Sequence, residues 1–280
     1  MKLLRWGEAG AEKPGMLDEA GAMRDLSSVV GDISGDVLSD KGLAALRALD
    51  PATLPKVPEG ARIGAPVAGV GKMIAIGLNY ADHAAEAGMQ APPEPVVFMK
   101  ATSAICGPND ATEKPRGSEK LDWEVELAFV IGKRAKYVTK DEALDHVAGY
   151  MLCNDVSERG FQTERSGQWV KGKSHDTFAP IGPWLVTRDQ VADPQALPMW
   201  LSVNGQGMQK GSTATMVYGV AYLVSYLSQF MTLEPGDIIT TGTPPGVGMG
   251  LKPPRFLNVG DVVELGIEGL GAQRQEIVAA

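Results

Sequence analysis

Three acidic residues at two places in the chain have the types and the spacing of a metal site. Glu124 and Glu126 lie two residues apart in DWEVELAFVIG, residues 122–132. If this segment is a strand, both side chains leave the same face, roughly 6.5–7 Å apart along the chain. Asp155 follows a second apolar segment, AGYMLCN, and would stand at a strand end, where functional residues are often found.

The two glutamates lie on a strand that reads as covered on both sides. The opposite face carries only apolar side chains, and Ala128 and Val130 follow the glutamates on their own face. A buried carboxylate must be protonated, paired with Lys or Arg, or bound to a metal. Salt bridging is the simpler interpretation of the two glutamates alone. A third carboxylate, with no His or Cys nearby, favours an oxygen-seeking ion, Mg²⁺ or Mn²⁺.

Several other polar side chains could hold a ligand beside these carboxylates. Arg159 and Gln162 are three residues apart and would face the same way on a helix, as a clamp for a carboxylate or carbonyl group. Two solvated surface residues are the alternative. Lys171 and Lys173 flank a glycine and would face the same side of an extended strand, where either could reach an oxyanion. Thr243 lies in a Thr-Gly-Thr-Pro loop in which glycine permits close approach to a ligand.

A possible base lies earlier, in GLNYADHAAEAG. His83 and Glu86 are three residues apart and would share one helical face. A carboxylate on one imidazole nitrogen fixes the tautomer and raises the basicity of the other nitrogen, as activation of a water molecule requires. The segment ends at a proline-rich stretch and could act as a lid. A surface histidine with a local partner is the alternative.

The elements that would position these residues are mostly strands. From residue 66 onwards, short apolar and β-branched segments alternate with Gly, Pro and Asn turns, and helical periodicity is largely confined to residues 140–147 and 215–230. Residues 1–65 contain short strand-like segments and one helical segment, 39–50. We therefore predict a small N-terminal α+β domain, residues 1–65, and a mainly β domain, residues 66–280.

Composition excludes several classes of protein. The 280 residues carry a net charge of −8 and a pI near 5.0, which argues against a general nucleic-acid-binding protein. No apolar run has the length of a membrane span and no signal peptide is evident, so we expect a cytoplasmic protein. Two cysteines are too few for a disulfide framework.

In the order of its motifs the chain resembles the fumarylacetoacetate hydrolase family over about residues 72–271. The matching stretches are GLNYADHAAE, FMKATSAICGP, DWEVELAFVIGK, GYMLCNDVSERGFQ, QWVKGKSHDTFAPIGPW, VNGQGMQ, LEPGDIITTGTPPGVG and FLNVGD. The resemblance implies a mixed β-sandwich roll behind a small N-terminal domain, assembled as a homodimer.

The resemblance also implies roles for the residues described above. It implies a set of metal ligands, which would be Glu124, Glu126 and Asp155. It implies a set of catalytic groups, namely the water-activating pair His83 and Glu86 and the carbonyl-directed cation Lys173. It implies substrate contacts, which would be Arg159, Gln162 and Thr243.

The N-terminal segment and the later KPPRFL resemble a bacterial subgroup often labelled ureidoglycolate lyase, which includes hydrolases of 2,4-diketo-3-deoxy sugar acids. The implied reaction is metal-dependent cleavage of a carbon–carbon bond in a 2,4-dioxo acid, specifically 2,4-diketo-3-deoxy-L-rhamnonate or L-fuconate, giving pyruvate and lactate. Oxo-acid decarboxylation, isomerisation and ureidoglycolate cleavage are alternatives on the same scaffold. A non-catalytic protein that binds metal or oxo acid is the remaining one.

Overall fold

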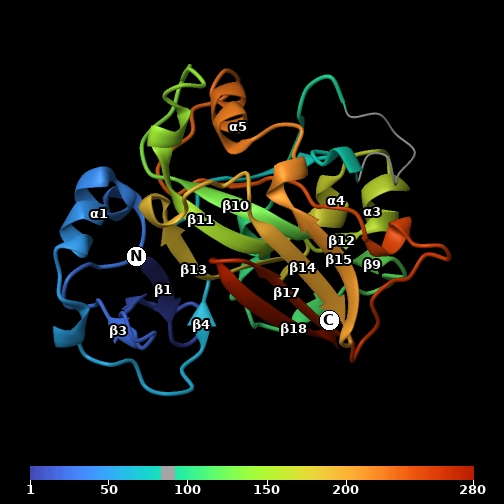
Figure 1. Cartoon of the computed structure of the whole chain (residues 1–280). Coiled ribbons are helices and arrows are strands. Elements are labelled where there is room, and N and C mark those ends of the chain that lie inside the picture. Colours follow the sequence, from blue (N-terminus) through green and yellow to red (C-terminus); the bar gives the residue numbers. More distant parts are fainter. Residues whose placement is uncertain (83–91) are drawn as a thin grey trace.

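A computed structural model describes residues 1–82 and 92–280 of the chain. Figure 1 shows a β-rich body with a few short helices at its margins and the N-terminal region, in blue, at one end. The predicted fold class, mainly β with few helices, is confirmed.

Two sheets form most of this body. Within the described residues the larger sheet has 11 strands. Nine of them lie side by side in the order β3 (Met23–Asp25), β2 (Lys13–Leu17), β1 (Lys2–Trp6), β13 (Ala179–Thr187), β11 (Val147–Asn154), β10 (Val125–Ile131), β16 (Ile238–Thr240), β5 (Met73–Gly77) and β6 (Val96–Lys100). The other two are β4 (Ile63–Gly64), which pairs with β1, and β7 (Ile105–Cys106), which pairs with β13.

The smaller sheet packs against the larger one through contacts of its strands with β10, β11 and β13. Its strands, in spatial order, are β15 (Gln206–Ser212), β14 (Pro198–Val203), β17 (Val262–Ile267), β18 (Gly271–Ala279) and β8 (Thr112–Lys114). A separate two-stranded ladder joins β12 (Ser157–Glu158) to β9 (Leu121–Asp122). This ladder lies directly before and after the acidic residues in sequence, so it helps to hold the ends of β10 and β11 together.

The helices are short. Those described are α1 (Asp40–Arg47), α3 (Arg159–Thr163), α4 (Val170–Lys173) and α5 (Val220–Leu227). The predicted N-terminal helix is confirmed as α1, which begins after Ser39, whose side chain accepts a hydrogen bond from the Gly42 amide. The apolar stripe of residues 215–230 forms the shorter α5. Among the described helices none has both the length and the apolar character to cross a membrane.

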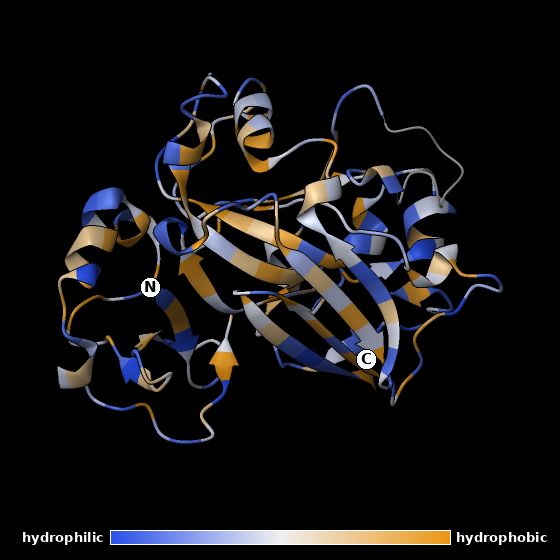
Figure 2. Ribbon diagram, viewed as in Figure 1, coloured by the Kyte–Doolittle hydropathy of each residue, from blue (hydrophilic) through white to orange (hydrophobic). Residues whose placement is uncertain are grey.

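The core lies between the two sheets and is centred on β10 and β11. Every residue of both strands is buried, and Figure 2 shows the central strands as predominantly hydrophobic. The prediction that residues 122–132 are covered on both sides is confirmed, because Trp123 and Phe129 on one face and Ala128 and Val130 on the other are fully buried. Any polar side chain on these strands is therefore held in a largely water-free environment.

The N-terminal strands extend the larger sheet. β1 pairs antiparallel with β13, with Lys2 opposite Val186 and Leu3 opposite Leu185. Residues far apart in sequence thus share one hydrogen-bonded ladder. The division of the chain near residue 65 stays a prediction.

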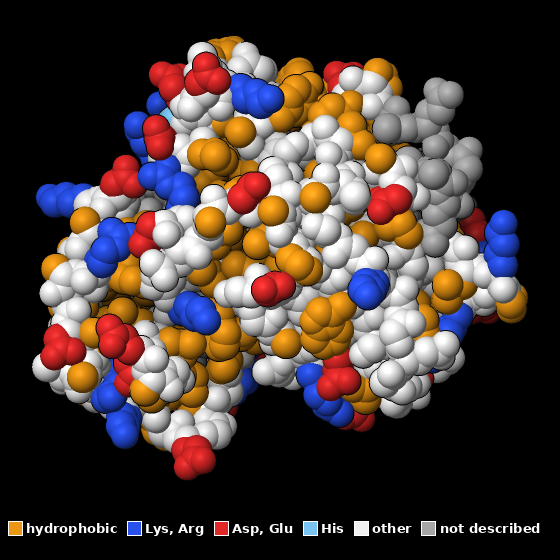
Figure 3. Space-filling model, in the orientation of Figure 1, with side chains coloured by type: hydrophobic (Ala, Val, Ile, Leu, Met, Phe, Trp, Pro, Cys, Tyr) orange, Lys and Arg blue, Asp and Glu red, His pale blue; other side chains and the backbone are white. Residues whose placement is uncertain are grey.

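Charged side chains of both signs are interspersed on the face shown in Figure 3, most densely around the N-terminal end, and they are sparser among the apolar and neutral groups of its centre. Neither sign forms a continuous area there.

Candidate metal centre and its cavity

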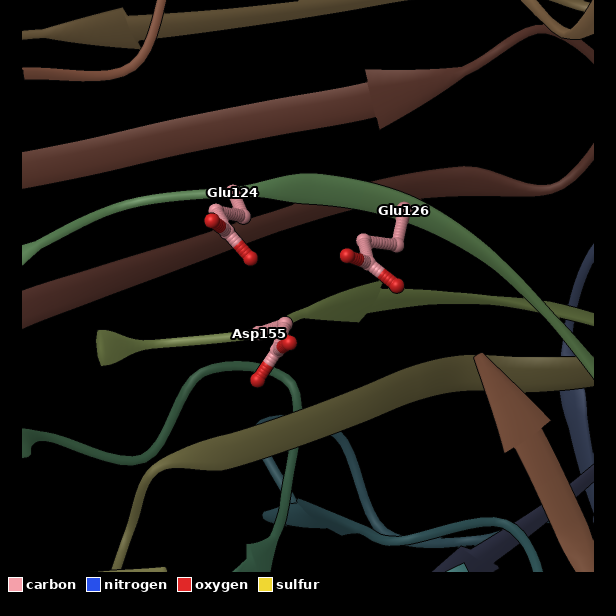
Figure 4. Close-up of side chains that lie close together, drawn as sticks. All are labelled: Glu124, Glu126 and Asp155. Atoms are coloured by element: carbon pink, nitrogen blue, oxygen red, sulfur yellow. The ribbon is translucent and has the colours of Figure 1, made fainter. Parts of the chain in front are cut away.

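Three carboxylates converge where β10 begins and β11 ends. Glu126 lies on β10 opposite Cys153, and Glu124 precedes the strand. The pairing continues beyond the strand ends, because the Asp155 amide donates to the Glu124 carbonyl at 2.9 Å. One oxygen from each of Glu124, Glu126 and Asp155 lies within 4.8 Å of the others, the one such acidic group found among the described residues. Figure 4 shows the two glutamates leaving the same side of their strand towards Asp155.

Two of these carboxylates are paired with buried cations. Lys173 Nζ lies 2.7 Å from Glu124 Oε2 and 2.7 Å from Asp155 Oδ2. The other oxygen of Glu124 faces Arg159 Nη2 at 2.7 Å, and the other oxygen of Asp155 accepts from Lys100 Nζ at 2.5 Å. All three cations are buried. Salt bridging, the simpler interpretation of the acidic pair, therefore applies to Glu124 and Asp155.

Glu126 differs from its neighbours. One of its oxygens accepts from the Gly242 amide at 2.9 Å, and within the described residues it has no Lys or Arg partner. Gly242 has φ +88°, and a Cβ there would lie 3.0 Å from the Asn79 side chain, so glycine permits the loop to bring this amide to the carboxylate.

The pKa values of the two glutamates move in opposite directions. Burial opposes ionisation of Glu124, but Lys173 and Arg159 outweigh it and hold its pKa at about 2. Burial raises the pKa of Glu126 well above the usual range, and the charges of Asp155 and Glu124 add to the increase. The same strand therefore carries one carboxylate that is strongly ionised and one that resists ionisation.

The donor set fits a divalent cation. Asp122 pairs with Arg159 at 2.8 Å, so four buried carboxylates face three cationic side chains and the fully ionised cluster carries one net negative charge. Three converging carboxylate oxygens without His or Cys suit Mg²⁺ or Mn²⁺. A cation here would also compensate Glu126, which forms no ion pair with a Lys or Arg among the described residues.

The carboxylates open onto a cavity of about 630 Å³, large enough for a small organic acid. Its polar end is formed by the acidic cluster with Lys173, Arg159 and Gln162. Its remaining walls are largely apolar and include Leu78, Phe98, Trp169, Val247, Met249 and Leu251. The indole of Trp169 packs edge-on against Phe98, with ring centroids 5.2 Å apart.

Arg159 and Gln162 lie together on α3, as their spacing predicts. Arg159 Nη1 donates to Gln162 Oε1 at 3.1 Å, and Arg159 Nε donates to Asp122 at 2.8 Å. With Glu124 on the remaining nitrogen, the guanidinium is held on three sides. Because the Gln162 carbonyl is already used, its amide NH₂ is the group available to a ligand. Both side chains are buried and line the cavity.

Thr243 also lines the cavity, but its hydroxyl is partly engaged. It donates to the Val125 carbonyl at 2.9 Å and accepts from Gln209 Nε2 at 2.8 Å. A hydroxyl has one hydrogen, so Thr243 in this arrangement can accept from a ligand but cannot donate to it.

The expectation that Lys171 and Lys173 share one side of an extended strand is wrong. The segment is the short helix α4, on which residues two apart point in different directions, so Lys171 is exposed and Lys173 is buried. Only Lys173 reaches the carboxylates. The predicted pair His83 and Glu86 lies outside the described residues, and its role stays a prediction.

Sequence reasoning missed two buried charges. Lys100, at the end of β6, holds Asp155, and Asp122 orients Arg159. Lys100 ends the apolar segment VVFMK, where a lysine reads as a solvated strand end. The signal for both residues is a charged side chain that adjoins an apolar strand. No spacing rule, however, connects Lys100 with Asp155.

Comparison with known proteins shows strong similarity over the whole chain. A sequence model described as fumarylacetoacetate (FAA) hydrolase C-terminal matches residues 72–278. A protein of Burkholderia multivorans that carries the provisional name of hydrolase is 66% identical over 281 residues, covering 100% of both chains.

Three solved structures show the same similarity. The fumarylacetoacetate hydrolase of Exiguobacterium antarcticum is 37% identical, with a TM-score of 0.85 and 100% coverage of both chains. The maleylpyruvate hydrolase of Sphingobium sp. SYK-6, solved with manganese(II) and pyruvate, is 30% identical, with a TM-score of 0.82 and 100% coverage of both chains. A 5-carboxymethyl-2-hydroxymuconate delta-isomerase of Mycobacterium smegmatis is 34% identical, with a TM-score of 0.79, and covers 100% of this chain and 99% of that one.

Proposed function

The chain belongs to the fumarylacetoacetate hydrolase family, and on this premise we propose that it is a divalent-metal-dependent hydrolase that cleaves a carbon–carbon bond in a 2,4-dioxo acid. The observation that carries the proposal is the convergence of three carboxylate oxygens within 4.8 Å on the wall of a cavity of about 630 Å³. The manganese(II) and pyruvate in the maleylpyruvate hydrolase structure support a metal and an oxo acid here.

Charge balance supports an oxo-acid monoanion as the group bound next to the cluster. The ionised cluster carries one net negative charge, so a divalent cation would turn it to one net positive charge. One substrate carboxylate would then bring the buried site to neutrality, which low-dielectric surroundings favour. A second carboxylate on the ligand would have to lie further out in the cavity.

A divalent ion held by Glu124, Glu126 and Asp155 would supply Lewis-acid polarisation of the 2-oxo group. The amide of Gln162, positioned by Arg159, would orient the substrate carboxylate. Lys173 lines the cavity and would stabilise the oxyanion that develops at carbon 4 when water attacks it. The bond between carbons 3 and 4 then breaks, its electron pair stays on carbon 3, and protonation of this enolate gives pyruvate while carbon 4 leaves in the acid product.

His83, oriented by Glu86, is our proposed base for the attacking water. If this is correct, His83→Ala should lower kcat by roughly 10²–10⁴-fold, because general base catalysis contributes about that much, and should leave Mn²⁺ affinity unchanged. Stopped assays of turnover and Mn²⁺ titration of the same variant separate these effects. Full activity in the variant would refute the assignment.

Within this class we propose 2,4-diketo-3-deoxy-L-rhamnonate or L-fuconate as substrate, with pyruvate and lactate as products. The support is the likeness of the N-terminal segment and KPPRFL to that subgroup. The cavity wall, which is largely apolar apart from the acidic cluster, its cations and Lys252, also suits the terminal methyl group of a 6-deoxy sugar acid. Fumarylpyruvate-type dicarboxylates are the natural comparison substrates.

The delta-isomerase among the similar structures favours keto–enol isomerisation as a second candidate. This reaction requires the same binding of an oxo acid but no attacking water. One substrate panel separates the candidates. Purified protein is incubated with 2,4-diketo-3-deoxy acids, 2-hydroxymuconate-type enols, oxaloacetate and ureidoglycolate, with Mg²⁺, Mn²⁺ or EDTA. Pyruvate without carbon dioxide indicates hydrolysis, and pyruvate with carbon dioxide indicates decarboxylation. An absorbance change without pyruvate indicates isomerisation, and urea indicates the lyase.

Turnover of no panel member, together with tight Mn²⁺ binding, would instead indicate a non-catalytic binding protein and would refute the proposed function. We also propose a homodimer in the cytoplasm. Both cysteines are free thiols, as a reducing compartment would keep them. Light scattering of the purified protein and fractionation of cells test these two points.

A further inference from the structure

Lys173 stands between two of the three proposed metal ligands. Its Nζ lies 2.7 Å from Glu124 Oε2 and 2.7 Å from Asp155 Oδ2, and the side chain is 2% exposed. The other two buried cations each contact only one proposed ligand, Lys100 at Asp155 and Arg159 at Glu124. One ammonium group thus already satisfies oxygens on two carboxylates that a metal ion would need.

The backbone next to Lys173 is closely packed, whereas its ammonium group is held by ion pairs alone and lines the cavity. A Cβ at the preceding residue, Gly172, would lie 2.4 Å from the Gln162 amide nitrogen and 2.5 Å from the Glu158 carbonyl oxygen, so α4 packs backbone to backbone against α3. Lys100 is held more completely, because its Nζ also lies 3.2 Å from the Val156 carbonyl oxygen and it does not line the cavity. The side chain of Lys173, unlike that of Lys100, can therefore change position when a metal ion binds.

The cavity offers the Lys173 ammonium another position. Lys173 and Phe98 both line the cavity, and Nζ already lies 5.3 Å from the centroid of the Phe98 ring. The face of an aromatic ring attracts a cation. Trp169 packs edge-on against this ring, with centroids 5.2 Å apart.

We propose that Lys173 is the internal counter-ion of the metal-free site and that a divalent cation displaces its ammonium from Glu124 and Asp155 into the cavity, against Phe98. This inference rests on the proposed function, since it assumes that the carboxylates bind a divalent ion. A divalent ion offers twice the charge of an ammonium group and shorter contacts to oxygen, and it repels an ammonium held at the same oxygens. Metal binding would thereby deliver the cation that acts on the substrate.

The proposal is tested on the unaltered protein by reductive methylation with formaldehyde and cyanoborohydride, followed by peptide mass spectrometry. The reaction is run with EDTA and with Mn²⁺. Methylation of Lys173 should increase several-fold when Mn²⁺ is present, because its amine leaves two ion pairs and enters an open cavity. Lys100, equally buried and retained at Asp155, is the internal reference and should stay unmodified in both conditions.

Two results would overturn the proposal, and they are distinguishable. Bound Mn²⁺ is counted by electron paramagnetic resonance in the same samples. If Mn²⁺ binds and Lys173 methylation is unchanged or reduced, the displacement is refuted while the metal site stands. If no Mn²⁺ binds at all, both the proposed function and this inference are refuted.

A variant provides an independent test. Lys173→Met removes the competing charge, so its Mn²⁺ affinity should increase by roughly tenfold, within the usual range of coupling between neighbouring charged groups. Its kcat should fall at the same time. Lys171→Met, on the same helix but exposed, is the matched control and should change neither quantity. Unchanged or weaker Mn²⁺ binding in folded Lys173→Met would contradict the displacement.

Discussion

Two clusters of acidic and basic side chains in this protein have similar charge but different architecture. The cavity cluster sets four carboxylates against three cations, all buried. The second cluster, which we call the N-terminal cluster, joins Arg5, Glu12, Asp32, Arg62 and Asp110. Its side chains are 10–30% exposed, and it too has one more carboxylate than it has cations. Counting charges would not distinguish the two.

Geometry does distinguish them. In the N-terminal cluster each arginine grips a carboxylate through two nitrogens, Arg62 with Asp110 and Arg5 with Asp32. Such fork-like pairs satisfy the carboxylate within the protein. In the cavity cluster the carboxylates point at one another, and each lysine meets a given carboxylate through one hydrogen bond only. Convergence of like charges in a buried place lowers the stability of the fold. It therefore indicates that the cluster binds a ligand and does not serve stability.

The largest expected effect comes from removing a converging carboxylate. Glu124→Gln should abolish Mn²⁺ binding and lower turnover by more than roughly 10²-fold. Mutation of a residue that only hydrogen-bonds a metal ligand already lowers activity by up to about 10²-fold, and a ligand itself should matter more. Glu12→Gln in the N-terminal cluster is the matched control and should leave Mn²⁺ affinity unchanged. Isothermal titration with Mn²⁺ and turnover assays measure both. Equal losses in the two variants would erase the distinction between the clusters.

A change of pH should separate Glu126 from Glu124. The pKa of Glu126 is raised in the folded protein, so its contribution to stability is present at low pH and is lost as pH rises above the ordinary carboxyl range. Glu126→Gln should therefore stabilise the metal-free protein at pH 8 and should remove the stabilisation by Mg²⁺.

Glu124 should behave in the opposite way. Its folded pKa of about 2 means that its contribution is present at neutral pH and is lost as pH falls from the ordinary carboxyl range towards 2. Glu124→Gln should thus lower metal-free stability at pH 8. Melting temperatures from pH 3 to 8, with EDTA or Mg²⁺, test both signs. A Glu126→Gln variant that melts below the unaltered protein at pH 8 in EDTA would contradict this assignment.

The smallest effect is expected in the N-terminal cluster. Arg62→Met should lower the free energy of unfolding by about 1–2 kcal/mol. Solvent screens the partly exposed pair of Arg62 and Asp110, but this pair is bidentate and Arg62 also contacts Glu12, so the effect should exceed that of an ordinary surface ion pair. Urea unfolding measures the change. Its kcat and Mn²⁺ affinity should equal those of the unaltered protein, and a shift in either would connect the two clusters.

Much of the fold could be predicted from sequence, because local pattern decides it. Alternation and flanking turn residues locate β10, β11 and the hairpin of β14 and β15, and Ser39 marks the start of α1. The acidic convergence was also predictable, since the side chains of Glu124 and Glu126 share one face of a buried strand. Asp155 was a candidate partner because it follows a second apolar segment, and the family resemblance implied the same role.

Tertiary contacts account for what sequence did not predict. The segment of Lys173 is too short for a periodicity, and it is helical because Gly172 packs against α3. The pairing of β1 with β13 joins residues more than half the chain apart, which local pattern does not encode. Lys100 became a partner of Asp155 for the same reason, since β6 is brought to the site by the sheet and not by sequence spacing.

The hydrogen bond from the Asp155 amide to the Glu124 carbonyl ties the dimensions of the acidic site to strand alignment. A slip of β10 by one residue against β11 would exchange the two glutamates for Trp123 and Val125 on that face. The spacing of two core strands therefore sets which ionic radii the site accepts. That spacing cannot change without disturbing the packing of the core. Ion discrimination in this protein should therefore weaken under the same conditions that begin to melt its central sheet.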